Sequence, residues 1–234
     1  MATREMSNTR LLLLLALCLS ASGAAAGPDG TANEDYTLPD PLKLAGGNRV
    51  KDASRWRLHR RPQILDLFEE HVYGEVPGRP EHMRIRVTEK SGKALDGRAI
   101  RKQVSIYFTA DRDRPRMDLL LYLPRDASGP VPAFLGLNFF GNQSIEHDPA
   151  IRITDQWVRN NPEKGIVDHR ATGESRGCND DRWPVERIVE NGYGLVTAYY
   201  GDLDPDYDDG FQNGVYPLFY EEGQQRPEPD EWGS

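Results

Sequence analysis

Three apolar runs dominate the middle of the chain. Residues 119–123, 133–137 and 195–199 are almost uninterrupted apolar sequence, which is typical of strands that are buried on both faces of a sheet. Between the last two runs, Val185, Ile188 and Val189 have helical spacing and Gly192 follows them, so a short helix is predicted there. A strand, a helix and a strand in this order predict a right-handed parallel crossover.

The part of the chain before these runs has amphipathic patterns instead. Apolar residues recur at positions 64, 68 and 72, after Pro62 and before Gly74, which predicts an amphipathic helix over residues 62–74. Residues 85–87 and 104–108 then alternate between apolar and polar, which predicts two half-buried antiparallel strands.

Together these patterns predict the fold class. An antiparallel start followed by a buried parallel region is the order in which an α/β-hydrolase sheet is built. The predicted class is therefore α/β, as the N-terminal half of an α/β-hydrolase fold: a three-layer αβα sandwich whose mixed sheet starts antiparallel. No repeat or linker divides it.

The first 26 residues have the order of a secretory signal peptide. Arg4 and Arg10 precede the apolar run 11–19, and three alanines occupy positions 24–26, so cleavage is predicted after Ala26 and the chain is expected to be secreted or periplasmic. A membrane helix needs roughly 18 apolar residues, so no membrane association is expected after cleavage. Residues 27–55, rich in Gly, Pro, Asp and Asn, predict a mobile lead-in, and residues 56–234 form the predicted, incomplete α/β-hydrolase domain.

Charge and cysteine content narrow the function classes. The formal net charge is −8, and removal of Arg4, Arg10 and Glu5 with the signal peptide makes it −9, which disfavours nucleic-acid binding. Only Cys178 is left after cleavage, so no internal disulfide is expected.

No metal or other cofactor is predicted. The five histidines lack zinc spacing, and the aspartates within residues 202–209 do not fit a calcium-binding EF-hand loop. These aspartates predict a solvated acidic loop, or a loop tied to arginines, and Arg182 is one hypothetical partner. Trp157 and Trp183 either line a sugar cleft or pack in the core.

One serine fits a hydrolase pattern by letter. Residues 173–177 read Gly-Glu-Ser-Arg-Gly, but a nucleophile elbow needs a buried strand directly before its serine and a histidine after it in the chain. Residues 165–172 are too polar for that strand, and His169, the last histidine, precedes Ser175. Ser175 is therefore interpreted as an ordinary loop serine.

The better candidate follows the apolar run 133–137. Asn138, Phe139, Phe140 and Gly141 form a polar, glycine-containing loop at the carboxyl end of a predicted central strand, where a hydrolase of this class places a backbone oxyanion-hole donor. Two interpretations stay open: an oxyanion-hole loop, or a strand-to-helix connection with two partly buried phenylalanines.

Four segments in this order resemble one enzyme family. They are residues 62–74 (PQILDLFEEHVYG), 135–142 (LGLNFFGN), 182–186 (RWPVE) and 200–206 (YGDLDPD). The chain is similar over most of its length to bacterial glucuronoyl esterases of carbohydrate esterase family 15, which are often labelled acetyl xylan esterases.

The resemblance implies a secreted serine esterase without a metal. Such an enzyme cleaves esters between glucuronic acid on glucuronoxylan and lignin alcohols, and its serine lies in a Gly-Cys/His-Ser-Arg-x-Gly-Lys elbow. That elbow is not in this sequence, so the resemblance places the nucleophile, the acid and the catalytic histidine beyond Ser234, and the chain alone is expected to be inactive. The alternatives are an acetyl xylan esterase or other carboxylesterase, or a non-catalytic carbohydrate-binding or interaction protein.

A stability expectation accompanies the fold. If the parallel strands end near Tyr199, the last strand exposes an unpaired apolar edge, so the isolated chain is expected to aggregate or to stay partly unfolded.

Overall fold

The computed structural model describes residues 37–111, 115–228 and 230–232. The signal-peptide prediction, and the lead-in prediction as far as residue 36, lie outside these ranges. Within them, no helix is both long enough and apolar enough to cross a membrane.

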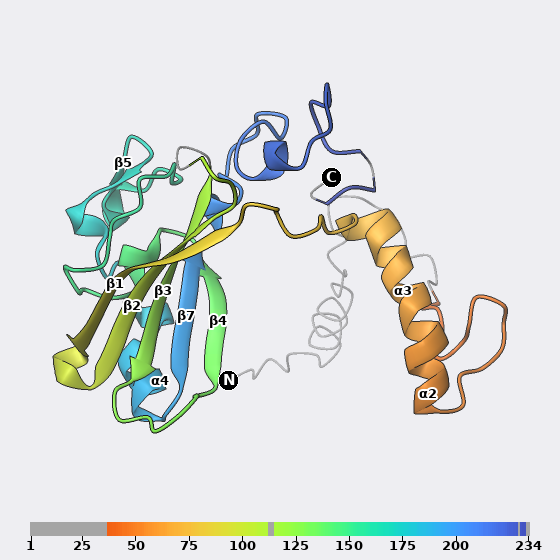
Figure 1. Cartoon of the computed structure of the whole chain (residues 1–234), viewed down its shortest axis with the longest axis horizontal. Helices are drawn as coiled ribbons and strands as arrows, with labels where there is room; N and C mark the ends of the chain where they lie inside the picture. Colours follow the sequence, from red (N-terminus) through yellow and green to blue (C-terminus); the bar gives the residue numbers. More distant parts are fainter. Residues whose placement is uncertain (1–36, 112–114, 229, 233–234) are drawn as a thin grey trace, which may run out of the picture.

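The predicted N-terminal helix is confirmed, and it starts earlier than expected. Helical conformation begins at α2 (Ala53–Arg55), where the Asp52 side chain accepts the Arg55 N–H, and continues through a π-helical turn (Trp56–Arg60), α3 (Arg61–Phe68) and a second π-helical turn (Glu69–Tyr73). Gly74 ends it with φ of 70°, as a C-terminal glycine does. Figure 1 shows this helix standing apart from the sheet, joined to it by an extended segment.

A five-stranded mixed sheet forms the centre of the fold (Figure 1). Its strands are β1 (Arg84–Ala94), β2 (Ala99–Tyr107), β3 (Arg116–Pro124), β4 (Ala133–Asn138) and β7 (Gly194–Tyr199), in the spatial order β1-β2-β3-β7-β4. The pairs β1/β2, β2/β3 and β3/β7 are antiparallel, and β4 pairs with β7 in parallel. This confirms the predicted fold class, with an antiparallel start and a parallel strand-helix-strand unit through α4 (Val185–Glu190).

The other elements are short. They are a small hairpin, β5 (Ile166–Val167) and β6 (Arg170–Ala171), and 3₁₀ turns at Leu95–Gly97, Asn142–Ile145, Pro162–Lys164, Gly173–Ser175, Asp180–Arg182, Tyr200–Asp202 and Tyr216–Leu218.

The main core lies between the sheet and α4. Its buried apolar residues include Leu120, Tyr122, Leu195, Val185 and Val189. Trp183 packs against this cluster, and a Cβ placed on Gly136 would lie 3.1 Å from the Trp183 ring. Gly136 therefore lets the Trp183 ring approach β4 closely, and Trp183 is a packing residue.

Within the described ranges, the opposite face of the sheet is largely apolar, and its apolar residues on β4 and β1 are exposed. Leu135 and Leu137 flank Gly136 on β4, so the alternation along a strand directs them away from Trp183 and α4. The register aligns Leu135 with Val196 on β7, and Val196 with Leu121 on β3. Leu135 is 77% exposed and Leu137 is 50% exposed. Ile85 and Val87 on β1, predicted to be half-buried, are also exposed.

Two predictions about strand burial were wrong. Residues 133–137 were predicted to be buried on both faces, and the strand ending at Tyr199 was predicted to leave the open edge. Instead β7 inserts between β3 and β4, so β7 has a neighbouring strand on each side and β4 is an edge strand of the described sheet. The unpaired apolar edge exists, but it belongs to β4.

Charging this edge is expected to reduce self-association. An open strand with exposed leucines can pair with the same strand of another molecule, and lysine on an edge strand blocks such pairing. The double variant Leu135→Lys/Leu137→Lys should therefore shift the chain from aggregates toward monomer in size-exclusion chromatography with light scattering. Leu38→Lys is the matched control, because Leu38 is also 77% exposed but lies outside the sheet. Equal aggregation of both variants would contradict the assignment of β4 as the strand through which the molecules associate.

Candidate functional site

The carboxyl ends of the two parallel strands place the candidate loop beside a second loop. Asn138 is the register partner of Tyr199, so the chain leaves β4 and β7 at the same edge of the sheet, where α/β proteins bind their ligands. The Phe139 ring lies 5.3 Å from the Tyr200 ring between centroids. The predicted loop 138–141 and residues 200–206 therefore form one rim.

Asn138 closes the loop onto the sheet. Its side chain is fully buried, and its Nδ2 donates to Asn142 Oδ1 at 2.8 Å and to Thr197 Oγ1 at 3.1 Å. Asn142 Nδ2 in turn donates to the Asp118 carbonyl on β3 at 2.7 Å. Because both amide groups hold the loop, an oxyanion donor here has to be a backbone N–H and not the Asn138 side chain.

Phe140 and Gly141 are held through their carbonyl oxygens. Gln143 Nε2 donates to the Phe140 carbonyl at 2.7 Å, and Ser144 donates to the Gly141 carbonyl from both its N–H and its Oγ. Gly141 has φ of 93°, and a Cβ there would lie 2.5 Å from Gln143 Oε1 and 2.7 Å from Thr154 Cγ2. Only glycine fits this turn without displacing neighbours.

The two phenylalanines of the loop differ in environment. Phe139 is exposed at the rim, whereas Phe140 packs against the small cluster of Val158, Ile166 and Tyr199. The Lys164 ammonium lies 5.0 Å from the centre of the Phe140 ring, within the range of a cation–π contact. Phe140 thus anchors the loop, and Phe139 is left available to a ligand.

Asp202 is a buried carboxylate at this rim that the sequence analysis did not single out. It follows β7 in the 3₁₀ turn Tyr200–Asp202 and is 6% exposed. Its Oδ2 accepts the Asp118 N–H of β3 at 2.8 Å. Burial raises the pKa of Asp202 to about 7, although the hydrogen bond from the Asp118 N–H opposes this shift. The carboxyl group therefore fixes the loop to the sheet while titrating near neutral pH.

Two arginines bind Asp118, the neighbour of Asp202. Arg116 bonds Asp118 at 3.2 Å and Asp155 at 3.1 Å, and Arg152 also pairs with Asp118. Although burial opposes it, the bond from Arg116 lowers the pKa of Asp155 below its ordinary value. Asp155 is therefore held ionised, whereas the nearby Asp202 holds its proton more tightly than an ordinary aspartate does.

Ser175 has the surroundings of a structural serine. It is fully buried, its Oγ donates to the Thr172 carbonyl at 2.7 Å, and it accepts Gln143 Nε2 at 3.1 Å. The strand before it, β6, has two residues, and the serine lies in a 3₁₀ turn. Through Gln143, Ser175 supports the candidate loop from behind.

The acidic loop is tied by an arginine other than the hypothetical partner Arg182. Arg159 Nε pairs with Asp206 Oδ2 at 2.7 Å, whereas Arg182 forms no ion pair within the described ranges. Asp204 accepts the Tyr216 hydroxyl at 3.2 Å. In the part of the chain that the structure describes, no three acidic, histidine or cysteine side chains are grouped to hold a metal ion.

Trp157 lies in a small aromatic cluster next to the rim. Its ring stacks on His169 at 4.7 Å and tilts against Tyr207 at 5.2 Å. Its carbonyl accepts the Tyr199 hydroxyl at 2.8 Å, so the cluster is fixed to the end of β7. Trp157 is thus a packing residue, and a ligand at the rim can reach its neighbours His169 and Tyr207.

These features define the class of protein. A mixed sheet with an antiparallel start, a parallel strand-helix-strand unit and a glycine-containing loop at the carboxyl end of the first parallel strand are those of an α/β-hydrolase fold.

Within that class, the chain is similar to carbohydrate esterase family 15. It is 45% identical over 199 residues to carbohydrate esterase MZ0003 from an unknown prokaryotic organism, covering 85% of this chain and 46% of that protein. The structure of a glucuronoyl esterase from Solibacter usitatus matches with 43% identity and a TM-score of 0.78, over 86% of this chain and 50% of the other. A promiscuous CE15 esterase from the marine bacterial metagenome matches with 43% identity and a TM-score of 0.73, over 86% and 49%.

The comparisons confirm the resemblance stated from the sequence. No protein-family model matches the chain. The chain spans about half the length of each of these three proteins.

Proposed function

We propose that this chain is the N-terminal part of a secreted serine-type carbohydrate esterase that cleaves glucuronic acid esters of xylan. The observation that carries the proposal is the 43% identity to a glucuronoyl esterase over 86% of the chain, at a TM-score of 0.78. The chain contains the sheet and its carboxyl-end rim, which is the part of an α/β-hydrolase that supports catalysis.

In this proposal the chain supplies support and one oxyanion donor. Acyl transfer needs a serine activated by a histidine and an acid, and in this proposal a part of the enzyme beyond Ser234 supplies all three. The loop of Phe139, Phe140 and Gly141 offers a backbone N–H at the edge where such a serine is presented. Its rigid attachment to β3 and β7 keeps that donor in place during the reaction.

The proposal also covers location and partner. The order of residues 1–26 supports export through a signal peptide, so the protein meets its polymer outside the cytoplasm. The acidic net charge of −8 fits a polysaccharide partner better than a nucleic acid.

The test begins with the source DNA past the Ser234 codon. An open frame leading into a Gly-x-Ser-Arg-x-Gly-Lys segment and a later histidine is expected. Its product should hydrolyse the methyl ester of glucuronic acid faster than it deacetylates acetylated xylan. The reverse preference would make it an acetyl xylan esterase. A stop codon there, together with xylan binding but no ester hydrolysis by the chain, would instead indicate a carbohydrate-binding protein.

A further inference from the structure

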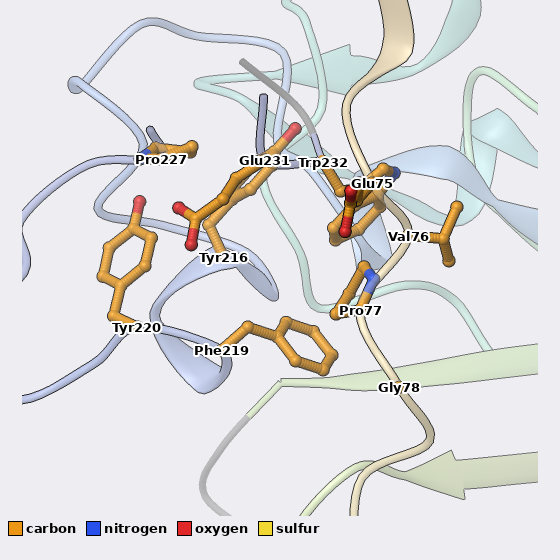
Figure 2. Close-up of a pocket in the computed structure, with 10 residues that line it drawn as sticks. All are labelled: Glu75, Val76, Pro77, Gly78, Tyr216, Phe219, Tyr220, Pro227, Glu231 and Trp232. Carbon is orange, nitrogen blue, oxygen red and sulfur yellow. The ribbon is translucent and has the colours of Figure 1, made fainter. Parts of the chain in front are cut away.

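A pocket with aromatic walls lies between two segments that are distant in sequence. Residues 75–78, which follow the N-terminal helix, form one side, and residues within 216–232 form the other (Figure 2). Its volume is about 330 Å³, which lies within the range of small-molecule sites. The two segments are joined by backbone bonds from Glu75 N to the Asp230 carbonyl at 2.7 Å and from Trp232 N to the Glu75 carbonyl at 3.1 Å.

The aromatic walls are fixed in place. Tyr216 lies 5.4 Å from the Trp232 ring, and Phe219 meets Trp232 edge-on at 6.1 Å. The Tyr216 hydroxyl donates to Asp204, and the Tyr220 hydroxyl donates to the Phe211 carbonyl at 2.6 Å. Rings that are already ordered lose little freedom when a ligand binds.

The polar groups of the pocket are acceptors. Glu75 and Glu231 contribute carboxylates, and none of the described lining residues is basic. Glu231 Oε2 already accepts Gln224 Nε2 at 2.5 Å and the Glu228 N–H at 2.8 Å, and Figure 2 shows this carboxylate directed toward Tyr220 and Pro227. An ionised carboxylate has about four acceptor sites, so Glu231 can still accept a hydroxyl beside these two bonds.

We infer that this pocket binds a neutral pyranose ring, such as an unsubstituted xylose unit of a xylan backbone. A sugar of this kind presents C–H faces to aromatic rings and hydroxyl donors to carboxylates. A uronic acid would bring its carboxylate against Glu75 and Glu231 without a basic partner, and like charges at close range repel. The choice of xylan rests on the proposed function, while the neutrality of the sugar follows from the pocket itself.

A side-chain hydrogen bond connects the pocket to the rim. Tyr216 forms a wall of the pocket, and its hydroxyl bonds Asp204 at 3.2 Å in the loop that follows β7. Holding an unsubstituted backbone unit here would anchor the polymer on the same loop system that leads to the rim.

Titration of the full chain with xylotetraose tests this inference, with tetragalacturonate as the charged comparison. Calorimetry should show binding of xylotetraose and none of tetragalacturonate. Phe219→Ala should weaken xylotetraose binding by about tenfold or more, as truncation of an aromatic anchor does, and Phe219→Tyr should restore it. Tyr193→Ala is the matched control, because Tyr193 is an exposed aromatic residue next to Phe134 and outside the pocket.

A second variant keeps the test decisive if Phe219→Ala does not fold. Val76 is an exposed wall residue, so Val76→Arg adds a cation without disturbing the core and should increase binding of tetragalacturonate. Unchanged xylotetraose binding in Phe219→Ala, a preference of the native chain for tetragalacturonate, or binding of tetramethylammonium but not xylotetraose would each overturn the inference. Since binding is measured without ester turnover, failure of the esterase proposal leaves this readout intact.

Discussion

Gly74→Ala is expected to detach the segment 230–232 from the N-terminal helix and to lower the free energy of unfolding by about 3 kcal/mol or more. Gly74 has φ of 70°, and a Cβ on it would overlap the Glu231 carbonyl oxygen and lie 2.5 Å from Trp232 N. These obstacles are backbone atoms, which cannot rotate away as a side chain can. Both the positive φ and the contact therefore oppose alanine.

A second glycine separates the two causes. Gly210 has φ of 72°, and nothing lies within 4 Å of the position that a Cβ would occupy there, so Gly210→Ala reports backbone strain alone and should cost about 1 kcal/mol. Urea unfolding compares the two variants, and limited proteolysis followed by mass spectrometry reports release of the C-terminal segment. Equal losses in both variants would show that the Gly74 contact with Glu231 contributes nothing.

Asp202→Asn is expected to raise stability above neutral pH and to change little in acid. The pKa of Asp202 is raised to about 7 by burial, whereas an unfolded aspartate titrates near its ordinary value of about 3.9. The folded state thus binds the proton more tightly, and stability falls as the pH rises between about 4 and 7. Asparagine is neutral throughout, and its amide oxygen can still accept the Asp118 N–H.

The size of this effect is bounded by the shift. At about 1.4 kcal/mol for each pKa unit, the gain of Asp202→Asn over the native chain reaches at most roughly 4 kcal/mol at pH 8 and vanishes near pH 4. Urea unfolding at both pH values measures it, with the exposed Asp126→Asn as control. A gain that is the same at pH 4 and pH 8 would contradict the raised pKa of the buried carboxyl group.

Local patterns predicted the elements well, because spacing reports local geometry directly. The helical spacing of Ile64, Phe68 and Val72 and the glycine at position 74 indicated the N-terminal helix. The apolar faces predicted for this helix and for β1 are exposed in the structure, since a pattern shows which face is apolar and not what covers it.

Strand order could not be predicted in the same way. Residues 133–137 and 195–199 have equally apolar sequences, yet β4 is an edge and β7 is internal. The difference arises from the crossover, which returns β7 to the space between β3 and β4, and no local property of either strand records this. Composition therefore predicted burial for both strands and was wrong for β4.

The candidate site was predicted only in part. The loop 138–141 could be predicted because an apolar run ends there at a glycine-containing turn. Asp202, by contrast, was grouped with the other aspartates of residues 202–209. Its position shortly after a buried strand was the available signal, because residues just beyond such a strand tend to stay near the core. Its bond to Asp118, 84 residues away, depends on the tertiary fold.

We propose that this chain can serve as the supporting half of a glucuronoyl esterase. The most direct measurement uses a chimera in which residues 37–232 replace the matching half of the Solibacter usitatus glucuronoyl esterase. Hydrolysis of a methyl glucuronate ester should be retained, and Gly141→Ala in the chimera should reduce kcat by about tenfold or more, since one oxyanion donor contributes a factor of roughly 10²–10³. A chimera that unfolds cooperatively but shows no ester turnover would contradict the claim.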